Sequence, residues 1–199
     1  MKNTFSKGFT LVELLIVITI LAALAAAVVV VLNPAQLLAQ ARDAQRLTDM
    51  TTMRDAINLF ITQTTAPNLC LPAAGGCSTG FCTVASAGPF QTACATNDVR
   101  LINGTGWVSV NFGAMVGGSP IAVLPRDPVS AGNFFYAYRA TAAGLFELAT
   151  RLESERHRGM MITDGGNQNT CSTFIDQGAW ATPTGLSCYF EVGTGVLSL

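Results

Sequence analysis

The hydrophobic residues of this chain fall into three patterns along its length. Residues 9–32 are apolar except for two threonines and Glu13. At about 1.5 Å per residue this run predicts a helix of roughly 36 Å, enough to cross a hydrocarbon layer of about 30 Å. Residues 33–63 repeat apolar and charged positions at helical spacing, and residues 64–199 hold glycine-rich turns and short alternating runs. The pattern predicts a membrane-spanning helix, an amphipathic helix and a globular domain.

The amphipathic segment is expected to pack one face against a sheet. Its later turns place Met50, Met53, Ile57 and Phe60 at helical spacing. Four apolar residues one to two turns earlier are expected to extend the same buried face: Leu37, Ala41, Ala44 and Leu47. Six charged residues fill the other side, and we interpret them as a solvated face or as contacts between subunits: Arg42, Asp43, Arg46, Asp49, Arg54 and Asp55. The segment opens at Asn33-Pro34-Ala35-Gln36, where Pro34 predicts a helix kink or a short unwound stretch.

The globular part is expected to form an antiparallel sheet. Five runs are typical of strands: residues 99–102, 107–112, 134–140, 145–152 and 186–192. The turn at residues 141–144 makes the clearest hairpin, and the alternation that follows it predicts one buried face. Residues 64–97 are interpreted as a disulfide-stapled loop. The predicted fold class is therefore α+β, a long N-terminal helix packed on an antiparallel β-sheet.

Six cysteines follow the apolar run. An even count in this position is typical of an exported, oxidising compartment and allows up to three disulfides, with 15 possible connectivities. A zinc site is disfavoured, because there is no C-x-x-C pair and the only histidine is His157. The disulfide candidates are Cys70, Cys77, Cys82, Cys94, Cys171 and Cys188.

Glu13 raises the sharpest functional question. A carboxylate inside an apolar span costs about 2.5–3.5 kcal/mol at the bilayer centre, so such residues are usually paired. No Lys or Arg lies between Phe9 and Arg42. A cut between Gly8 and Phe9 would create an α-amine one helical turn from Glu13. That amine could pair with Glu13 of its own chain or of a neighbour.

The residues from Lys7 to Leu15 resemble the N-terminus of the type IV prepilin family, which includes the pseudopilins of type II secretion. The resemblance implies cleavage after Gly8 by a prepilin peptidase, methylation of Phe9, and contact of Glu13 with the amine of an adjacent subunit. It also implies a pilin-like fold, insertion in the cytoplasmic membrane with the globular domain outside, and a helical homo-oligomer built by a membrane assembly platform. Surface pili of this kind serve adhesion and twitching motility, and pseudopili serve protein secretion.

The resemblance divides the chain into four parts, namely a leader at 1–8, the spanning segment at 9–32, the amphipathic helix at 33–63 and the pilin domain at 64–199. A type IV pilus subunit is the favoured interpretation, with a major pseudopilin and a membrane-tethered tip adhesin as alternatives. An ordinary secretory signal is a further alternative, with cleavage in the alanine tract at residues 23–27. The small residues of that tract would also let neighbouring helices approach closely.

A second resemblance concerns the sheet region. Residues 124–128, 136–138, 148–154 and 164–166 look like the corresponding region of major pseudopilins, and the family implies a Cys171–Cys188 disulfide near the C-terminus. Those pseudopilins continue Asp-Pro with Trp-Gly and often bind calcium, whereas this chain has Val129-Ser130. Three aspartates could supply oxygen ligands, but turn formation is the simpler interpretation and no cofactor is expected: Asp127, Asp164 and Asp176.

Composition disfavours several other functions. The net charge is −1, and without the leader it is −3, with 9 arginines against 12 acidic residues, so nucleic-acid binding is not expected. The sequon at Asn103 is interpreted as a chance match. The basic cluster is interpreted as a solvated loop: Arg151, Arg156, His157 and Arg158. No G-x-S-x-G, H-E-x-x-H or Walker motif occurs, so the chain is not expected to be an enzyme.

Overall fold

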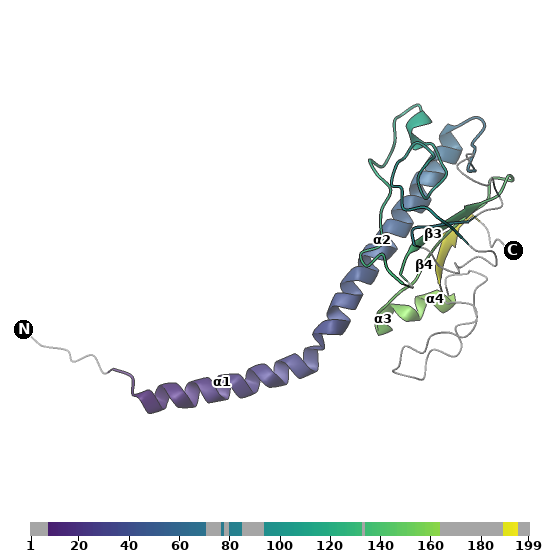
Figure 1. The fold of residues 1–199 in the computed structure, drawn as a ribbon. Helices are drawn as coiled ribbons and strands as arrows, with labels where there is room; N and C mark the ends of the chain where they lie inside the picture. The colour runs from purple at the N-terminus through teal and green to yellow at the C-terminus, as the bar shows by residue number, and fades with distance from the viewer. Residues whose placement is uncertain are drawn as a thin grey trace, which may run out of the picture. The chain divides into compact units, whose positions relative to one another are not determined.

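The chain comprises two compact units. The computed structural model describes residues 8–70, 77, 80–84, 94–132, 134–163 and 189–194. The first unit is Met1–Leu38 and the second is Ala39–Leu199. The first unit holds an apolar helix and the start of a second helix, and the second unit holds the rest of that helix and a five-stranded sheet (Figure 1). The predicted α+β class is confirmed.

Helix α1, Leu11–Leu32, is followed after one residue by helix α2, Pro34–Gln63. Asn33 ends α1 in the left-handed conformation, with φ of 40°. Proline disfavours the helical conformation in the residue before it, and asparagine tolerates the left-handed region better than most residues. The Asn33 carbonyl accepts the backbone N–H of Gln36 at 3.0 Å and so starts α2. The predicted break at Pro34 is confirmed.

The buried stripe of α2 begins at Ala39 and then includes two charged residues. Met50, Met53, Ile57 and Phe60 are buried as predicted, but Leu37, Ala41 and Ala44 are exposed, and Leu47 is half-buried and packs against the core. The expected earlier part of the stripe is therefore wrong for Leu37, Ala41 and Ala44. The buried residues between Ala39 and Met50 are the charged Asp43 and Arg46, so the hydrophobic pattern did not mark them. The complete set of buried α2 residues is Ala39, Asp43, Arg46, Met50, Met53, Ala56, Ile57 and Phe60.

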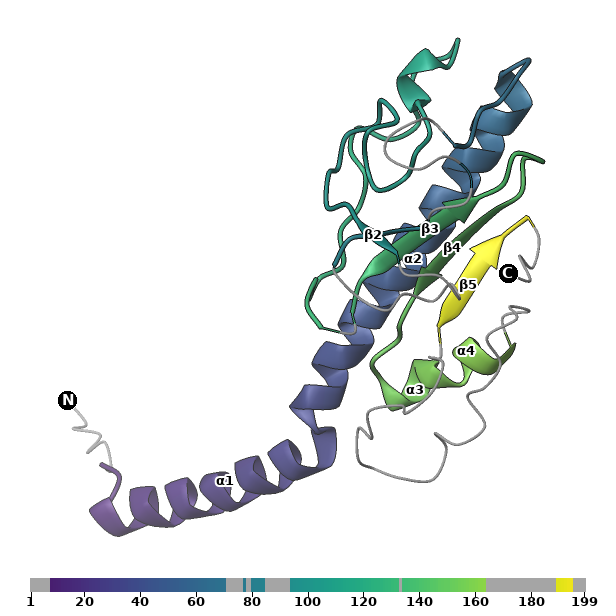
Figure 2. The same ribbon diagram turned by 45° about the vertical axis from the view of Figure 1, so that its right-hand side comes forward.

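The sheet is mixed, which corrects the prediction of an antiparallel sheet. Its order is β2-β1-β3-β4-β5, and the β1–β2 pair is parallel while the other pairs are antiparallel (Figure 2). Strands β1 and β2 lie in the segment interpreted as a disulfide loop, and their shortness left no alternation to detect. The strands are β1 Phe81–Cys82, β2 Ala95–Thr96, β3 Tyr136–Ala140, β4 Phe146–Thr150 and β5 Phe190–Gly193.

The β3–β4 hairpin is confirmed. Its turn closes with the Thr141 N–H donating to the Leu145 carbonyl at 2.8 Å, and Gly144 takes φ of 82°, which glycine adopts without strain. Both faces of β4 are buried, whereas one buried face was predicted. One face packs with α2 through residues such as Tyr138 and Leu148, and Ala149 lies in a second cluster on the other face.

The strands predicted at 99–102 and 107–112 are wrong. These segments form turns joined by one isolated bridge, Asn103 to Asn111, and the end of the second is a 3-10 turn, η2, Phe112–Ala114. The side chain of Asn97 donates to the carbonyl of Gly106 at 2.9 Å, and Trp107 donates to the carbonyl of Pro125 at 3.0 Å. Residues 107–112 pack in the core without joining a ladder, whereas Val99 and Leu101 are exposed, so apolar runs misled the prediction.

Two disulfides join the four described cysteines. Cys70 pairs with Cys77 and Cys82 pairs with Cys94, with Cα separations of 4.9 and 5.5 Å. The Cys171–Cys188 disulfide expected from the family leaves these four cysteines to pair among themselves, and that pairing is confirmed. Cys171 and Cys188, together with Asp164 and Asp176, lie outside the described residues.

Two short helices follow β4, namely α3, Glu155–Arg158, and α4, Met160–Thr163. Ser154 caps α3, and its hydroxyl accepts the N–H of His157 at 3.4 Å. The region was expected to be a solvated loop. Arg156 is exposed, but Arg151 is only 6% exposed, so the expectation is wrong for that residue.

Candidate functional site

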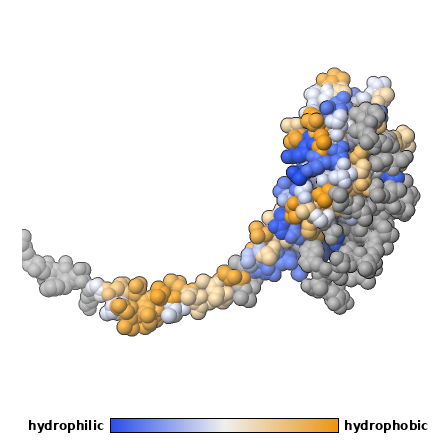
Figure 3. Space-filling model, in the orientation of Figure 1, coloured by the Kyte–Doolittle hydropathy of each residue, from blue (hydrophilic) through white to orange (hydrophobic). Residues whose placement is uncertain are grey.

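Helix α1 presents apolar side chains on all sides. The window Leu11–Val29 is apolar apart from Glu13 and Thr19, and none of it is buried within the chain. Figure 3 shows the largely apolar surface of this helix on one face. By length and composition the helix is able to cross a membrane. A continuous apolar surface of this size is unfavourable in water, so lipid or other protein surfaces must cover it.

Glu13 lies in the first turn of α1 and forms a capping box with Thr10. The backbone N–H and the hydroxyl of Thr10 both donate to Oε2 of Glu13, at 2.9 and 2.8 Å. The Glu13 N–H donates back to the Thr10 hydroxyl at 3.2 Å. These bonds satisfy donors that every helix start leaves open. The role of Thr10 was missed in the sequence, although the T-x-x-E spacing is the signature of such a box.

Gly8 and Phe9 precede the helix in an irregular segment. Both are exposed, Phe9 at 82%, and no atom lies within 4 Å of the position that a Cβ on Gly8 would take. The peptide bond between them is therefore open to another protein. The structure thus places the predicted processing residues, Gly8 and Phe9, and the predicted assembly residues, Phe9 and Glu13, at one end of α1.

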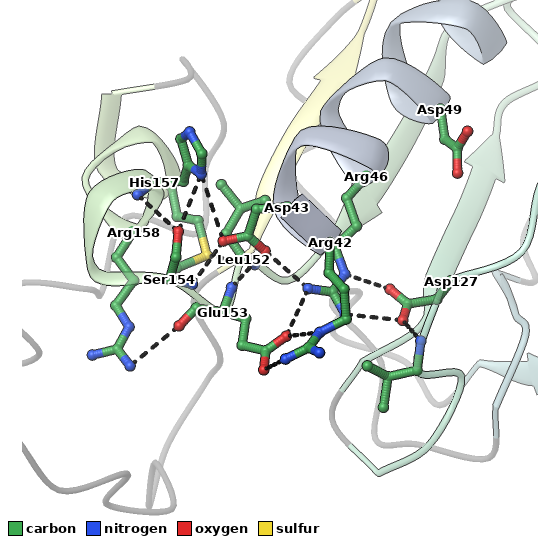
Figure 4. Close-up of polar contacts among 12 residues, drawn as sticks. Arg42, Asp43, Arg46, Asp49, Asp127, Leu152, Glu153, Ser154, His157 and Arg158 are labelled. Carbon is green, nitrogen blue, oxygen red and sulfur yellow. Dashed lines mark hydrogen bonds and ion pairs between the residues drawn. The ribbon is translucent and has the colours of Figure 1, made fainter. Parts of the chain in front are cut away.

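A second polar site lies in the second unit, around Arg46 of α2 (Figure 4). The Arg46 side chain is fully buried, as are those of Asp43 and Asp127. Its Nε and Nη2 donate to the two carboxylate oxygens of Asp127 at 2.7 and 3.0 Å. Its Nη1 donates to Asp43 at 2.8 Å and to Glu153 at 3.3 Å. The guanidinium also lies 4.7 Å from the ring centre of Phe134.

The carboxylates around Arg46 are held by backbone groups. Asp43 accepts the N–H of Glu153 at 2.8 Å and the N–H of Ser154 at 2.6 Å. Asp127 accepts the N–H of Val129 at 2.8 Å, as expected of a turn-forming aspartate. These bonds satisfy buried charges that would otherwise be costly. The interpretation of the α2 charges as a solvated face is therefore wrong for Asp43 and Arg46, because their partners lie far away in the sequence.

Hydrogen bonding and burial shift the pKa values of Arg46 and Glu153 in opposite directions. Burial alone would lower the pKa of Arg46, but hydrogen bonds to Asp127 and Asp43 outweigh it and raise the pKa. A hydrogen bond from Arg42, whose Nε lies 2.8 Å from Oε2, lowers the pKa of Glu153 against the opposing effect of burial. The shifts in pKa therefore favour the charged forms of Arg46 and Glu153.

The structure gives Asp127 a partner other than a metal ion, since both of its carboxylate oxygens accept from Arg46. Within the described ranges, no group of three or more His, Cys, Asp or Glu residues is arranged to hold a metal ion. The other two calcium ligands considered from the sequence, Asp164 and Asp176, lie outside those ranges, so the expectation for that set stays a prediction.

The comparisons bear on the N-terminal site. A family model described as the prokaryotic N-terminal methylation motif matches residues 4–29. No curated protein and no solved structure matches the chain. The matched segment includes Gly8, Phe9, Thr10 and Glu13 and most of α1. The chain therefore carries a type IV prepilin-like N-terminal signal, followed by an apolar helix and an α+β unit, which supports a type IV pilin-like or pseudopilin protein.

Proposed function

We propose that the chain is the structural subunit of a type IV pilus, cut after Gly8 and assembled by packing of its α1 helices. The observation that carries the proposal is the exposure of α1, which is apolar over Leu11–Val29 and buries none of that window within its own chain. Lipid covers such a helix in the precursor, and other α1 helices cover it in a filament. The methylation motif at residues 4–29 supports the same two states.

Glu13 supplies the polar contact in this assembly. In the uncut chain its carboxylate accepts from Thr10. Cleavage after Gly8 makes Phe9 the first residue, and the positive α-amine of a neighbouring subunit then becomes a stronger partner, because bonds between charged groups exceed those between a charge and a neutral donor. A paired carboxylate can stay within an apolar filament core, whereas an unpaired one is expelled.

The N-terminus of the exported protein tests the processing step. Mass spectrometry of the surface-sheared fraction should find a chain that begins at Phe9 with one added methyl group on the amine. A chain that keeps its first eight residues, or that begins in the alanine tract at residues 23–27, would contradict the proposal. Electron microscopy of the same fraction should show filaments made of this subunit.

The major pseudopilin alternative uses the same motif and processing, so the same mass spectrum fits it. The two functions separate by location and dependence. A pilus subunit forms long surface fibres when no secretion system is expressed, whereas a pseudopilin needs that system and affects the export of its cargo. A tip adhesin would be present in only a small proportion relative to the main subunit.

A further inference from the structure

The structure assigns a second role to the cluster of Asp43, Arg46, Asp127 and Glu153, hereafter the Arg46 cluster. The cluster fixes the axial position of α2 on the sheet, and assembly of the filament requires that fixed position. The requirement for assembly rests on the proposed function, whereas the fixed position of α2 concerns the second unit alone.

The apolar contacts of α2 do little to fix an axial position. Its buried stripe continues as Met50, Met53, Ile57 and Phe60, spaced so that a shift of one turn brings one apolar residue near the place of another. Methionine fills irregular gaps easily, and hydrophobic burial has no preferred direction. A helix held by this stripe alone is able to settle at more than one position.

The contacts of Arg46 are directional. Two parallel hydrogen bonds join its Nε and Nη2 to Asp127, and a third joins Nη1 to Asp43. A planar guanidinium meets a carboxylate in this paired way over a narrow range of positions. A shift of one helical turn, about 5.4 Å, would break all three bonds and leave the charges buried and unpaired.

The cluster joins segments that are distant in the sequence. Asp43 and Arg46 belong to α2, Asp127 belongs to the loop before β3, and Glu153 follows β4 (Figure 4). Asp43 also accepts the backbone N–H groups of Glu153 and Ser154, which fixes it to the segment between β4 and α3. Three points of attachment on two sides of one helix turn set both its axial position and its rotation.

Stability and position are separable in such a cluster. Replacing a buried ion network by neutral groups of similar shape is often neutral or stabilising, whereas removing one partner is destabilising. The test variant is therefore Arg46→Met with Asp43→Asn and Asp127→Asn. At position 127 asparagine keeps the one oxygen that accepts the N–H groups of Val129 and Ser130. At position 43 it keeps an acceptor for one of the two N–H groups of Glu153 and Ser154, which bond to different oxygens of Asp43. No uncompensated charge remains at these three positions. The control is Arg54→Met with Asp55→Asn, which removes an ion pair from the exposed side of the same helix.

The axial position is measured by electron spin resonance distances in the full chain in detergent micelles. Spin labels are placed on Thr52→Cys in α2 and Leu145→Cys in the hairpin turn, both exposed positions outside the cluster. The chain without these cysteines gives the background. We expect one narrow distance distribution in the otherwise unchanged chain and in the control, and a distribution displaced or split by about one turn, 5.4 Å, in the triple variant.

Assembly is measured in parallel as the yield of sheared filaments from cells that express each chain. The triple variant should fold, as judged by circular dichroism, and yield about tenfold less filament than the control, since tenfold corresponds to only 1.4 kcal/mol of contact energy. An unchanged distance distribution in a folded triple variant would show that the Arg46 cluster does not fix the axial position of α2. A displaced distribution with a full filament yield would overturn its role in assembly.

A second variant covers the case in which the triple variant does not fold. Arg46→Lys keeps the charge but cannot make the paired bonds to Asp127, so it should broaden the distance distribution while the chain stays folded. A distance distribution as narrow as that of the unchanged chain would contradict the proposal that the Arg46 cluster fixes the axial position of α2. Absence of filaments from the unchanged chain would count against the proposed function alone, because the distance comparison needs no filament.

Discussion

The two consecutive helices place a charged side chain in opposite environments. In α1, Glu13 is exposed on an apolar helix, and the donors to it among the described residues come from Thr10, one turn away. In α2, Arg46 is fully buried and receives three carboxylates from its own chain. The charge of Arg46 is therefore neutralised by carboxylates of the same chain. The charge of Glu13 has only the neutral donors of Thr10 among the described residues.

This difference separates what a chain needs to fold from what it needs to associate. Removing a partner from Arg46 leaves charges buried within the subunit, so the cost falls on folding. Removing Glu13 is expected to leave the fold of the second unit unchanged, because Glu13 belongs to the first unit and, among the described residues, its printed hydrogen bonds join it to Thr10 of that same unit. A variant that affects assembly through α1 is therefore expected to leave folding of the second unit unchanged, and a variant in the second unit is expected to leave processing at the N-terminus unchanged.

The largest effect on filament assembly is expected for Glu13→Leu. The substituted chain should insert in the membrane and be cut after Gly8, because leucine suits an apolar span. Assembly should fall about tenfold or more, since losing a desolvated ion pair costs at least the 1.4 kcal/mol that a factor of ten requires. The measurement is the yield of sheared filaments in cells that lack the unchanged chain.

The matched control is Thr19→Leu, which removes a polar group from the same helix without removing a charge. Thr19 only donates to the carbonyl of Ile16. Its filament yield should stay near that of the unchanged chain. Equal losses in both variants would mean that polarity of the helix, and not the carboxylate of Glu13, governs assembly.

Arg46→Met alone should be the most destabilising change in the second unit. It leaves Asp43 and Asp127 as buried carboxylates without their cation, and breaking a buried pair in this way costs about 3–5 kcal/mol. Urea unfolding of the full chain in detergent measures the change. Arg54→Met, at an exposed pair on the same helix, should cost less than about 1 kcal/mol. Similar costs for the two would contradict the central place of Arg46.

The two helices also differ in how far their sites could be predicted. The proposed processing site and Glu13 lie within about two turns of one another, so a local pattern was enough to single them out as candidates. The Arg46 cluster depends on Asp127, 81 residues later, and on Glu153, 107 residues later. Charged residues at helical spacing resemble a solvated face until their partners are known, so no local pattern could reveal this site.

The fold shows the same limit. The β3–β4 hairpin was predictable because alternation and turn residues are local signals. The segment around Trp107 was mistaken for a strand, because its apolar run reflects burial by surrounding loops and not membership of a ladder. Strands β1 and β2 were missed, because two-residue strands are held by neighbours and by the Cys82–Cys94 disulfide.

Removing that disulfide should have an intermediate effect confined to the second unit. Cys82→Ala with Cys94→Ala opens a loop with a sequence separation of 12 residues, which costs about 2–3 kcal/mol by the entropy of the unfolded chain. Thermal unfolding measures the loss. Cys70→Ala with Cys77→Ala opens a shorter loop, with a separation of 7 residues, and should cost less. Cleavage after Gly8 should be normal in both, and impaired cleavage would show that the two units are not independent.

The smallest effect is a dependence on pH at Glu153. A hydrogen bond from Arg42 is the largest cause that lowers the pKa of this carboxyl below its usual value of 4.5. A lowered pKa in the folded state means that Glu153 stabilises the fold above its unfolded pKa, and that this stability is lost as the pH falls through the folded pKa. Glu153→Gln should therefore cost about 1 kcal/mol near pH 7, the value of a modest charged hydrogen bond, and the difference should shrink below about pH 4. Urea midpoints of the two chains from pH 7 to pH 3 measure this trend, and a difference that stays constant across the range would mean that Glu153 contributes by shape and not by charge.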